Sequence, residues 1–219
     1  MGYVITIDGP AASGKSSLSR ALSKKLEIPW VSTGAFYRGL AYAALQRKIA
    51  LTDKVALSEL ALSPVWRVEM TPEKTQVWFE DQDVTEKISQ EDVGNYASQV
   101  SHYPEVRSSL LDHQRQCAVK AGGLIAEGRD CGTVVFPQAE AKIYLTASSE
   151  NRAHRRAQEQ GLDQKKTEVQ QQQRDQQDSS RKTAPLQVPQ DALVLDTTNL
   201  DFNQVVSKVE QFVRSKLQL

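Results

Sequence analysis

Apolar positions follow two spacings along the chain, and the two alternate from the first residues to the last. Short apolar or β-branched runs, typical of buried strands, occupy 4–7, 28–31, 124–126, 142–146 and 192–195. Between them, apolar residues three and four positions apart predict helices over 18–26, 35–47, 104–120 and 202–213, and a further helix that ends at 58–62. This alternation predicts an α/β fold, a parallel sheet flanked by helices on both faces.

Residues that favour helix ends sharpen some of these boundaries. Residues 32–34 offer an N-cap for the helix at 35–47. Ser89, with Asp92 three residues later, resembles a capping box that opens a helix through 98–103. Pro104 suits the first position of the next helix, and Gly122-Gly123 suits its end.

One segment departs from the helix–strand alternation. Residues 66–70 and 75–80 alternate apolar and polar positions around Pro72-Glu73-Lys74, which predicts a hairpin. Together with 81–88 it forms a small antiparallel insert between segments that look helical.

A second unusual segment, 159–177, is rich in Gln, Lys and Asp and poor in large apolar residues. It follows a helix that Ser148 or Ser149 caps. Such a composition fits either disorder or a solvated, mobile helix, and we favour the helix. Arg174, Asp178 and Arg181 fall at i, i+4 and i+7, on one face of that helix. This face is either a solvated salt-bridge ladder or a lining that closes over a polyphosphate.

The strongest single motif stands at the N-terminus. The strand at 4–7 leads through Asp8 into Gly9-Pro10-Ala11-Ala12-Ser13-Gly14-Lys15-Ser16-Ser17, which fits G-x-x-x-x-G-K-[ST], and a helix follows. In such a loop, backbone N–H groups converge on a polyphosphate, Lys15 reaches the β- and γ-phosphates, and the Ser16 hydroxyl faces Mg²⁺. The sequence therefore predicts a site for a nucleoside triphosphate.

Composition narrows the partners. The 219 residues include 27 basic and 27 acidic side chains, a net charge of +0, so a nucleic acid polymer is not expected to bind. Cys117 and Cys131 form neither a disulfide framework nor a zinc spacing. No apolar run approaches the length of a membrane span and no signal peptide precedes the first strand, so we expect no membrane partner and a cytoplasmic location.

The chemistry that the remaining motifs favour is phosphoryl transfer. Glu127-Gly128-Arg129-Asp130 follows a buried strand, where ligands of parallel sheets bind; Arg129 would point toward the transferring phosphate, and Asp130 would bind a base edge or organise the metal. The three histidines are scattered, and the DxxG and NKxD motifs of GTPases are absent. Asp196 imitates a metal-binding strand end but is followed by a turn, so we treat it as a decoy. A phosphate acceptor needs no general base, only Mg²⁺ and arginines that hold two anions in line.

Taken together, the motifs resemble bacterial cytidylate kinases over nearly the whole chain and in the same order. They are GPAASGKSS, STGAFYR at 32–38, ASQV at 97–100, PEVR at 104–107, GRDCGTVVFP at 128–137, RAHRR at 152–156, R-D-x-x-D-S-x-R at 174–181, and ALVLDTT. The resemblance implies phosphoryl transfer from ATP to CMP or dCMP with Mg²⁺. It also implies a P-loop kinase core at about 1–62, 89–156 and 184–219, a monophosphate-binding insert at about 63–88, and a lid at about 157–183.

The resemblance also implies roles for individual residues. Residues 9–17 would hold the ATP phosphates, with Ser16 toward Mg²⁺. The monophosphate would meet Thr33, Tyr37 and Arg38, and the cytosine would meet Ser98, Arg107 and Asp130. Arg129 would grip phosphate, and the lid would supply sugar and phosphate contacts from Arg174, Asp178 and Arg181. Catalysis would rest on Lys15, Arg129, Arg174 and Arg181.

Some positions depart from the family pattern. Many relatives have Gly and Thr after the loop lysine, where this chain has Ser16 and Ser17. Relatives often carry an arginine where Ser89 stands; Lys87 is a candidate substitute.

Two alternative functions stay open: a small P-loop kinase for UMP, dTMP or a non-nucleotide acceptor, and a catalytically weak nucleotide-binding protein. We expect a monomer.

Overall fold

The computed structural model describes residues 2–161 and 163–218, without the side chains of Glu159, Gln160, Lys166 and Arg174. Its centre is a parallel sheet in the order β2-β6-β1-β7-β8. The strands are β1 (Val4–Asp8), β2 (Trp30–Ser32), β6 (Leu124–Gly128), β7 (Ala141–Thr146) and β8 (Leu193–Asp196). The predicted α/β class and parallel sheet are confirmed, with strand ends displaced by one or two residues.

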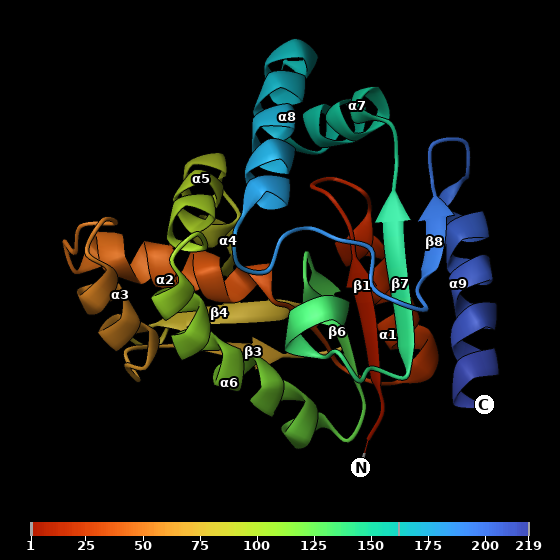
Figure 1. Ribbon diagram of the computed structural model, residues 1–219, viewed down its shortest axis with the longest axis horizontal. Coiled ribbons are helices and arrows are strands. Elements are labelled where there is room, and N and C mark those ends of the chain that lie inside the picture. Colours follow the sequence, from red (N-terminus) through yellow and green to blue (C-terminus); the bar gives the residue numbers. More distant parts are fainter. Residues whose placement is uncertain (1, 162, 219) are drawn as a thin grey trace.

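Helices cover both faces of this sheet (Figure 1). On one face lie α1 (Lys15–Leu26) and α9 (Phe202–Leu217), whose apolar residues meet those of β1 and β7 in one core. On the other lie α2 (Gly34–Gln46), α3 (Lys54–Ala61) and α6 (Pro104–Ala121). Ile125 faces the first core, and its neighbours Leu124 and Ala126 face the second. This division explains why the β6 segment is apolar at successive positions.

The predicted hairpin is confirmed as an antiparallel sheet of β3 (Trp66–Met70), β4 (Thr75–Phe79) and β5 (Gln82–Asp83). It packs on α2: the rings of Phe36 and Trp66 meet edge to face with centroids 6.4 Å apart. A short helix α4 (Thr85–Ile88) leads from it to α5 (Glu91–Val100). The insert thus adjoins the helix whose first turn carries Tyr37 and Arg38.

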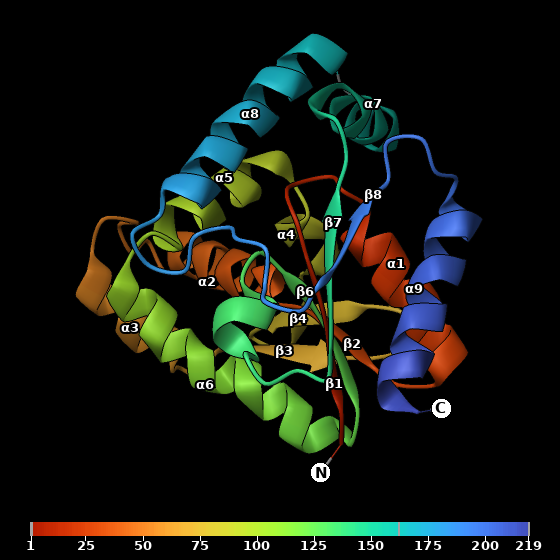
Figure 2. The same cartoon turned by 45° about the vertical axis from the view of Figure 1, so that its right-hand side comes forward.

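The glutamine-rich segment is helical: α7 (Ser149–Gln160) is followed by α8 (Gln164–Ser180), and the two pack together beyond the carboxyl ends of the strands (Figure 2). Ser148, not Ser149, caps α7, because its hydroxyl accepts the N–H of Asn151. Arg181 follows the last residue of α8, so Arg174, Asp178 and Arg181 do not all lie within one helix.

One capping prediction is wrong, and another holds for the position alone. The Ser89 hydroxyl donates to the main-chain oxygen of Glu86 at 2.6 Å, and α5 begins at Glu91 without a side-chain cap. Thr33 stands at the N-cap position of α2 as predicted, but it makes no side-chain capping bond, because its hydroxyl donates to the main-chain oxygen of Glu127. At α6 the prediction holds: Pro104 is its first residue, and Gly122 ends it with a φ of 70°.

Gly39 of α2 tests how closely the insert packs on the core. A Cβ there would lie 3.0 Å from ring carbon Cε3 of Trp66 and from Cγ1 of Val77. We expect Gly39→Ala to destabilise the chain by about 1 kcal/mol, because overpacking of about 1–3 kcal/mol exceeds the gain in helix propensity of up to about 1 kcal/mol. Urea unfolding measures this, and a more stable variant would mean that the hairpin yields to the added methyl group.

Candidate functional site

A cavity of about 250 Å³ lies beyond the carboxyl ends of β1, β2 and β6. Its walls come from segments far apart in the sequence: the 9–17 loop, the first turns of α2, α5, the 127–130 turn, and helices α7 and α8 with the residue that follows α8. The residues that line it are Ala11, Ala12, Lys15, Ser16, Ser32, Thr33, Gly34, Tyr37, Arg38, Gly94, Ala97, Ser98, Ser101, Glu127, Gly128, Arg129, Asp130, Arg156, Asp178 and Arg181.

The 9–17 loop takes the shape that its glycines permit. A Cβ on Gly9 would lie 2.2 Å from the main-chain oxygen of Leu145, and Gly14 has a φ of 89° at the start of α1. The buried Lys15 ammonium donates to the Pro10 main-chain oxygen at 2.7 Å. Burial, with the nearby charge of Arg129, lowers the pKa of Lys15 to about 7. A polyphosphate beside this amine would favour its charged form.

Glu127 is the site residue that sequence reasoning missed. It is the penultimate residue of the fully buried strand β6, and its carboxylate accepts the Ser16 hydroxyl at 3.0 Å. The metal role suggested for Asp130 therefore suits Glu127 better, since Glu127 is the acidic residue that touches the loop hydroxyl. An acidic residue at the end of a buried parallel strand was the available signal.

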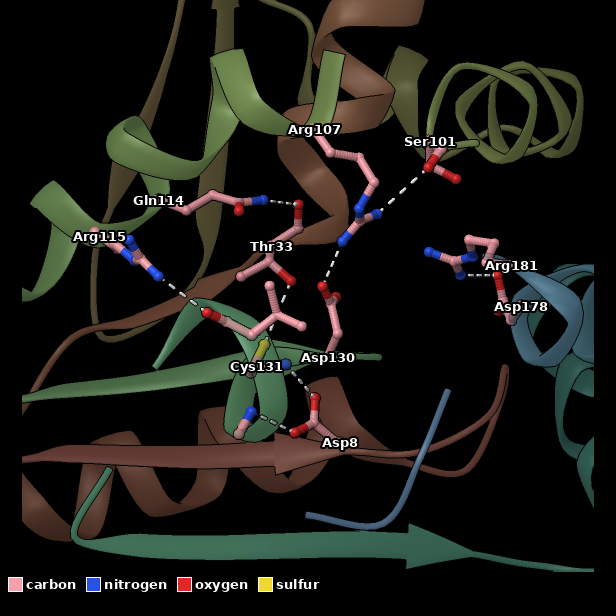
Figure 3. Close-up of polar contacts among 12 residues, drawn as sticks. Asp8, Thr33, Ser101, Arg107, Gln114, Arg115, Asp130, Cys131, Asp178 and Arg181 are labelled. Atoms are coloured by element: carbon pink, nitrogen blue, oxygen red, sulfur yellow. Dashed lines mark hydrogen bonds and ion pairs between the residues drawn. The ribbon is translucent and has the colours of Figure 1, made fainter. Parts of the chain in front are cut away.

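Asp130 instead forms a buried ion pair with Arg107 of α6 (Figure 3). Arg107 also donates to the Ser101 main-chain oxygen at 3.4 Å, and its guanidinium lies 5.3 Å from the centre of the Tyr37 ring. Burial raises the pKa of Asp130 although the Arg107 charge opposes the shift, and burial raises the pKa of Tyr37 to about 12. The Asp130 carboxylate and the Tyr37 ring line the cavity and suit a flat, hydrogen-bonding ligand, whereas the buried Arg107 is not among the lining residues.

A second buried ion-pair group joins α8 to the turn that follows β6. Asp178 of α8 accepts Nε of Arg129 at 2.7 Å and also pairs with Arg181. Burial alone would raise the pKa of Asp178, but the two guanidinium charges hold it below its usual value. Asp178 and Arg181 therefore line the cavity as predicted, whereas the side chain of Arg174 lies outside the described residues.

The remaining predicted acceptor contacts lie at the insert side of the cavity. Arg38 donates to the main-chain oxygens of Ile88 and Gln90 at 2.6 and 3.1 Å. Ser98 lines the cavity, but the exposed Lys87 does not. Thr33 also lines the cavity, but its hydroxyl donates to the main-chain oxygen of Glu127.

Arginines of α7 lie beside the phosphate loop, although the sequence pattern did not predict a role for any one of them. Arg152 donates to the Ala11 main-chain oxygen at 3.1 Å and pairs with Asp175 of α8 at 2.6 Å. Arg156 lines the cavity and pairs with Glu91 of α5 at 2.6 Å.

A second cavity of about 290 Å³ lies on the other side of the loop. Its wall combines polar loop atoms with apolar side chains: Ser13, Gly14, Ser17, Leu145, Arg155, Thr197, Leu200, Phe202 and Val205. Arg155 is fixed there by two bonds to Thr197, at 3.1 Å to the hydroxyl and 2.8 Å to the main-chain oxygen. Residues 13, 14 and 17 thus face a different cavity from residues 11, 12, 15 and 16.

Three further observations concern Asp196, membrane-spanning helices and clusters of metal-binding side chains. Asp196, the exposed last residue of β8, accepts the Thr198 hydroxyl at 2.6 Å and lines neither cavity. Within residues 2–161 and 163–218, no helix is long and apolar enough to cross a bilayer. The same residues hold no cluster of three His, Cys, Asp or Glu side chains placed to bind a metal.

Comparison with solved structures supports the fold. The chain superposes on an uncharacterised protein from Eubacterium ventriosum with a TM-score of 0.56 at 10% identity, covering 97% of this chain and 99% of that one. For the protein TT1252 from Thermus thermophilus the TM-score is 0.51 at 18% identity, with 99% and 98% covered.

Comparison of sequences identifies the family. The chain is 64% identical over 217 residues to the cytidylate kinase of Bdellovibrio bacteriovorus, covering 99% of this chain and all of the relative. It is 45% identical to the cytidylate kinase of Salmonella choleraesuis, with 99% and 97% covered. Residues 5–215 match the family pattern of cytidylate kinases. The chain therefore belongs to the cytidylate kinase family, a family of nucleoside monophosphate kinases.

Proposed function

We propose that this chain transfers the terminal phosphoryl group of ATP to CMP or dCMP, giving ADP and CDP or dCDP, with Mg²⁺ bound through the nucleotide. The observation that carries the proposal is the pairing of two unlike sites in one cavity. Lys15 and Ser16 of the phosphate loop stand on one wall, and Asp130, which pairs with the buried Arg107, stands on another.

The donor half consists of residues 9–17 and the second cavity. Backbone N–H groups and Lys15 would hold the ATP phosphates, while the base and sugar would extend toward Arg155 and Phe202. Arg155 already lies against this cavity, where its guanidinium plane suits stacking on a base.

The acceptor half reads the base through hydrogen-bond complementarity. Asp130 accepts from an exocyclic amino group, which cytosine has and uracil lacks, and Arg107 with Ser98 donates to the acceptor edge of the ring. Tyr37 and Arg38 flank the monophosphate, which is already ionised near neutral pH, so no general base is required.

The lid and the strand ends supply the positive charge that the transition state needs. Arg129 and Arg181 lie in the cavity with Asp178 between them, and Arg174 is expected to join them when the lid closes. Lys15 stabilises the developing charge from the loop side. Catalysis would thus consist of holding two anions in line inside a site that excludes water.

The residues present fit a magnesium ion. Ser16 and Glu127 offer a hydroxyl and a carboxylate 3.0 Å apart, and hard oxygen donors of this kind suit Mg²⁺ together with phosphate oxygens. The ion, when bound, neutralises charge on the transferring phosphate. The monomer expected from the sequence stays a prediction.

The proposal is tested by measuring ADP formation with a panel of acceptors: CMP, dCMP, UMP, dTMP, AMP and GMP. We expect CMP and dCMP to exceed all others in kcat/KM by at least about tenfold, because Asp130 offers an acceptor that pairs with the cytosine amino group. Equal rates with UMP or AMP would refute the choice of base, and turnover with none of them would favour a nucleotide-binding protein.

Asp130→Ala should reduce the preference for CMP over UMP by about 10- to 100-fold, because it removes one base contact worth about 1–3 kcal/mol. The kcat/KM ratio of the two acceptors measures this, with thermal unfolding to check the fold, since Arg107 loses a buried partner. Arg67→Ala, on the exposed hairpin, removes a paired arginine outside the cavity and serves as a control. An unchanged ratio would place base recognition elsewhere.

Glu127→Gln should raise the Mg²⁺ concentration for half-maximal activity by about tenfold, because a charged oxygen ligand becomes neutral while the amide oxygen still accepts from Ser16. Glu127→Asp keeps the charge and should stay nearer the parent value. Titration of activity with Mg²⁺ at fixed ATP measures both. If the two variants match the parent chain, the metal is held without Glu127.

A further inference from the structure

The residues that follow β6 turn through an unusual π-helical segment, η1 (Cys131–Val135), before the chain reaches β7. Arg129 and Asp130, which face the cavity, stand directly before this segment. Its internal hydrogen bonds run from the N–H groups of Val134 and Val135 to the main-chain oxygen of Asp130, at 2.9 and 3.1 Å. The position of Asp130 is therefore set by the position of η1.

The start of η1 is held by Asp8, the last residue of β1. The N–H groups of Cys131 and Gly132 have no helical partner, and they donate to the two oxygens of the Asp8 carboxylate at 2.8 and 2.7 Å. Asp8 is fully buried, and Figure 3 shows its carboxylate beneath Asp130. Burial raises the pKa of Asp8 to about 6, against the effect of the two N–H donors.

The end of η1 is held from the opposite side. Arg115 of α6 donates to the main-chain oxygens of Val135 and Val134, at 3.0 and 3.1 Å. A carboxylate at the first N–H groups and a guanidinium at the last carbonyls both match the dipole of a helical turn. The turn is tightly enclosed as well, because a Cβ on Gly132 would lie 2.8 Å from Oγ1 of Thr6 and 2.9 Å from Pro189.

Asp8 and Arg115 have no place among the residues that line the cavity. Keeping a carboxylate in a fully buried position costs free energy, which a purely structural apolar residue would avoid. The two hydrogen bonds that Asp8 accepts explain why a carboxylate is kept there, because they fix the turn on which Arg129 and Asp130 stand.

We propose that Asp8 and Arg115 are positioning residues of the acceptor site: together they clamp η1 and so set the place of Asp130 against the acceptor base. This inference rests on the proposed function for the identity of that base. Because Asp8 directly precedes Gly9, the same carboxylate also fixes the distance between the phosphate loop and the base-reading turn.

Asp8→Asn tests the clamp, because the amide keeps the shape but turns an N–H₂ group toward one of the two N–H donors. We expect faster amide hydrogen exchange over 131–135, a KM for CMP raised about tenfold, and a reduced preference for CMP over UMP, the size expected for one lost hydrogen bond to a charged group. The KM for ATP should stay within about twofold. Thr6→Val is the matched control: its hydroxyl is buried on the same strand near Gly132 but makes no hydrogen bond among the described residues.

Arg115→Gln provides a second test that does not depend on β1, since Arg115 is an exposed residue of α6. It should produce the same shift toward faster exchange and a higher KM for CMP, with a smaller amplitude. Lys120→Gln removes a positive charge from the same helix and is the control. If Asp8→Asn fails to fold, Arg115→Gln carries the test alone.

The proposed clamp would be overturned if amide hydrogen exchange over 131–135 stayed at the parent rate in both variants. It would also be overturned if exchange became faster while the CMP kinetics stayed unchanged, or if the only kinetic effect were on the KM for ATP. A parent chain that turned over UMP as well as CMP would instead refute the proposed base. Hydrogen exchange would still decide the clamp in that case, because it does not depend on the acceptor.

Discussion

The site depends on the parallel register of β1 and β6. Asp8 pairs with Gly128 in the sheet, so the phosphate loop and the 127–130 turn leave neighbouring strands at the same level. Everything else in the cavity is arranged around these two exits: Ser16 meets Glu127 across the gap, and Asp8 meets the turn that follows Asp130. Parallel strands with helical connections place such exits at one edge of a sheet without further design.

Buried charges gather at this edge far more densely than stability would favour. Arg107 with Asp130, and Arg129 and Arg181 with Asp178, are ion pairs whose side chains are mostly removed from water. A buried ion pair stabilises little, because desolvation offsets the attraction, and replacing it with apolar groups is often neutral or stabilising. A role in binding therefore explains these buried ion pairs better than a role in stability does. The guanidinium groups of Arg129 and Arg181 line the cavity, where they suit a ligand with two phosphate groups.

Periodicity predicted the fold well, because each strand of the sheet is short and apolar and each helix that covers it is amphipathic. The phosphate loop was predicted because its function depends on residues next to one another in the sequence: its glycines and Lys15 act through local backbone geometry. Glu127 was missed because its role depends on a hydroxyl 111 residues away. Ser89 and Thr33 were assigned to caps because the local pattern allows it, but their hydroxyls have other partners, Ser89 on the preceding short helix and Thr33 across the sheet. Asp8 and η1 were not predicted at all, since neither propensity nor spacing reveals a π-helical turn clamped from two distant elements.

Helix α8 shows how a polar segment can be ordered without a core of its own. Helix α8 turns a polar face to α7: Gln171 donates to the main-chain oxygen of Arg152 at 3.3 Å, and Asp175 pairs with the same arginine. Through Arg152 this face reaches the Ala11 oxygen of the phosphate loop, and through Asp178 it reaches Arg129. Contacts of this type hold α8 by charge and hydrogen bonding instead of by buried apolar area. Phosphate oxygens bound in the cavity would compete with Asp178 for the guanidinium groups of Arg129 and Arg181, and this competition would link ligand binding to the contacts that hold α8.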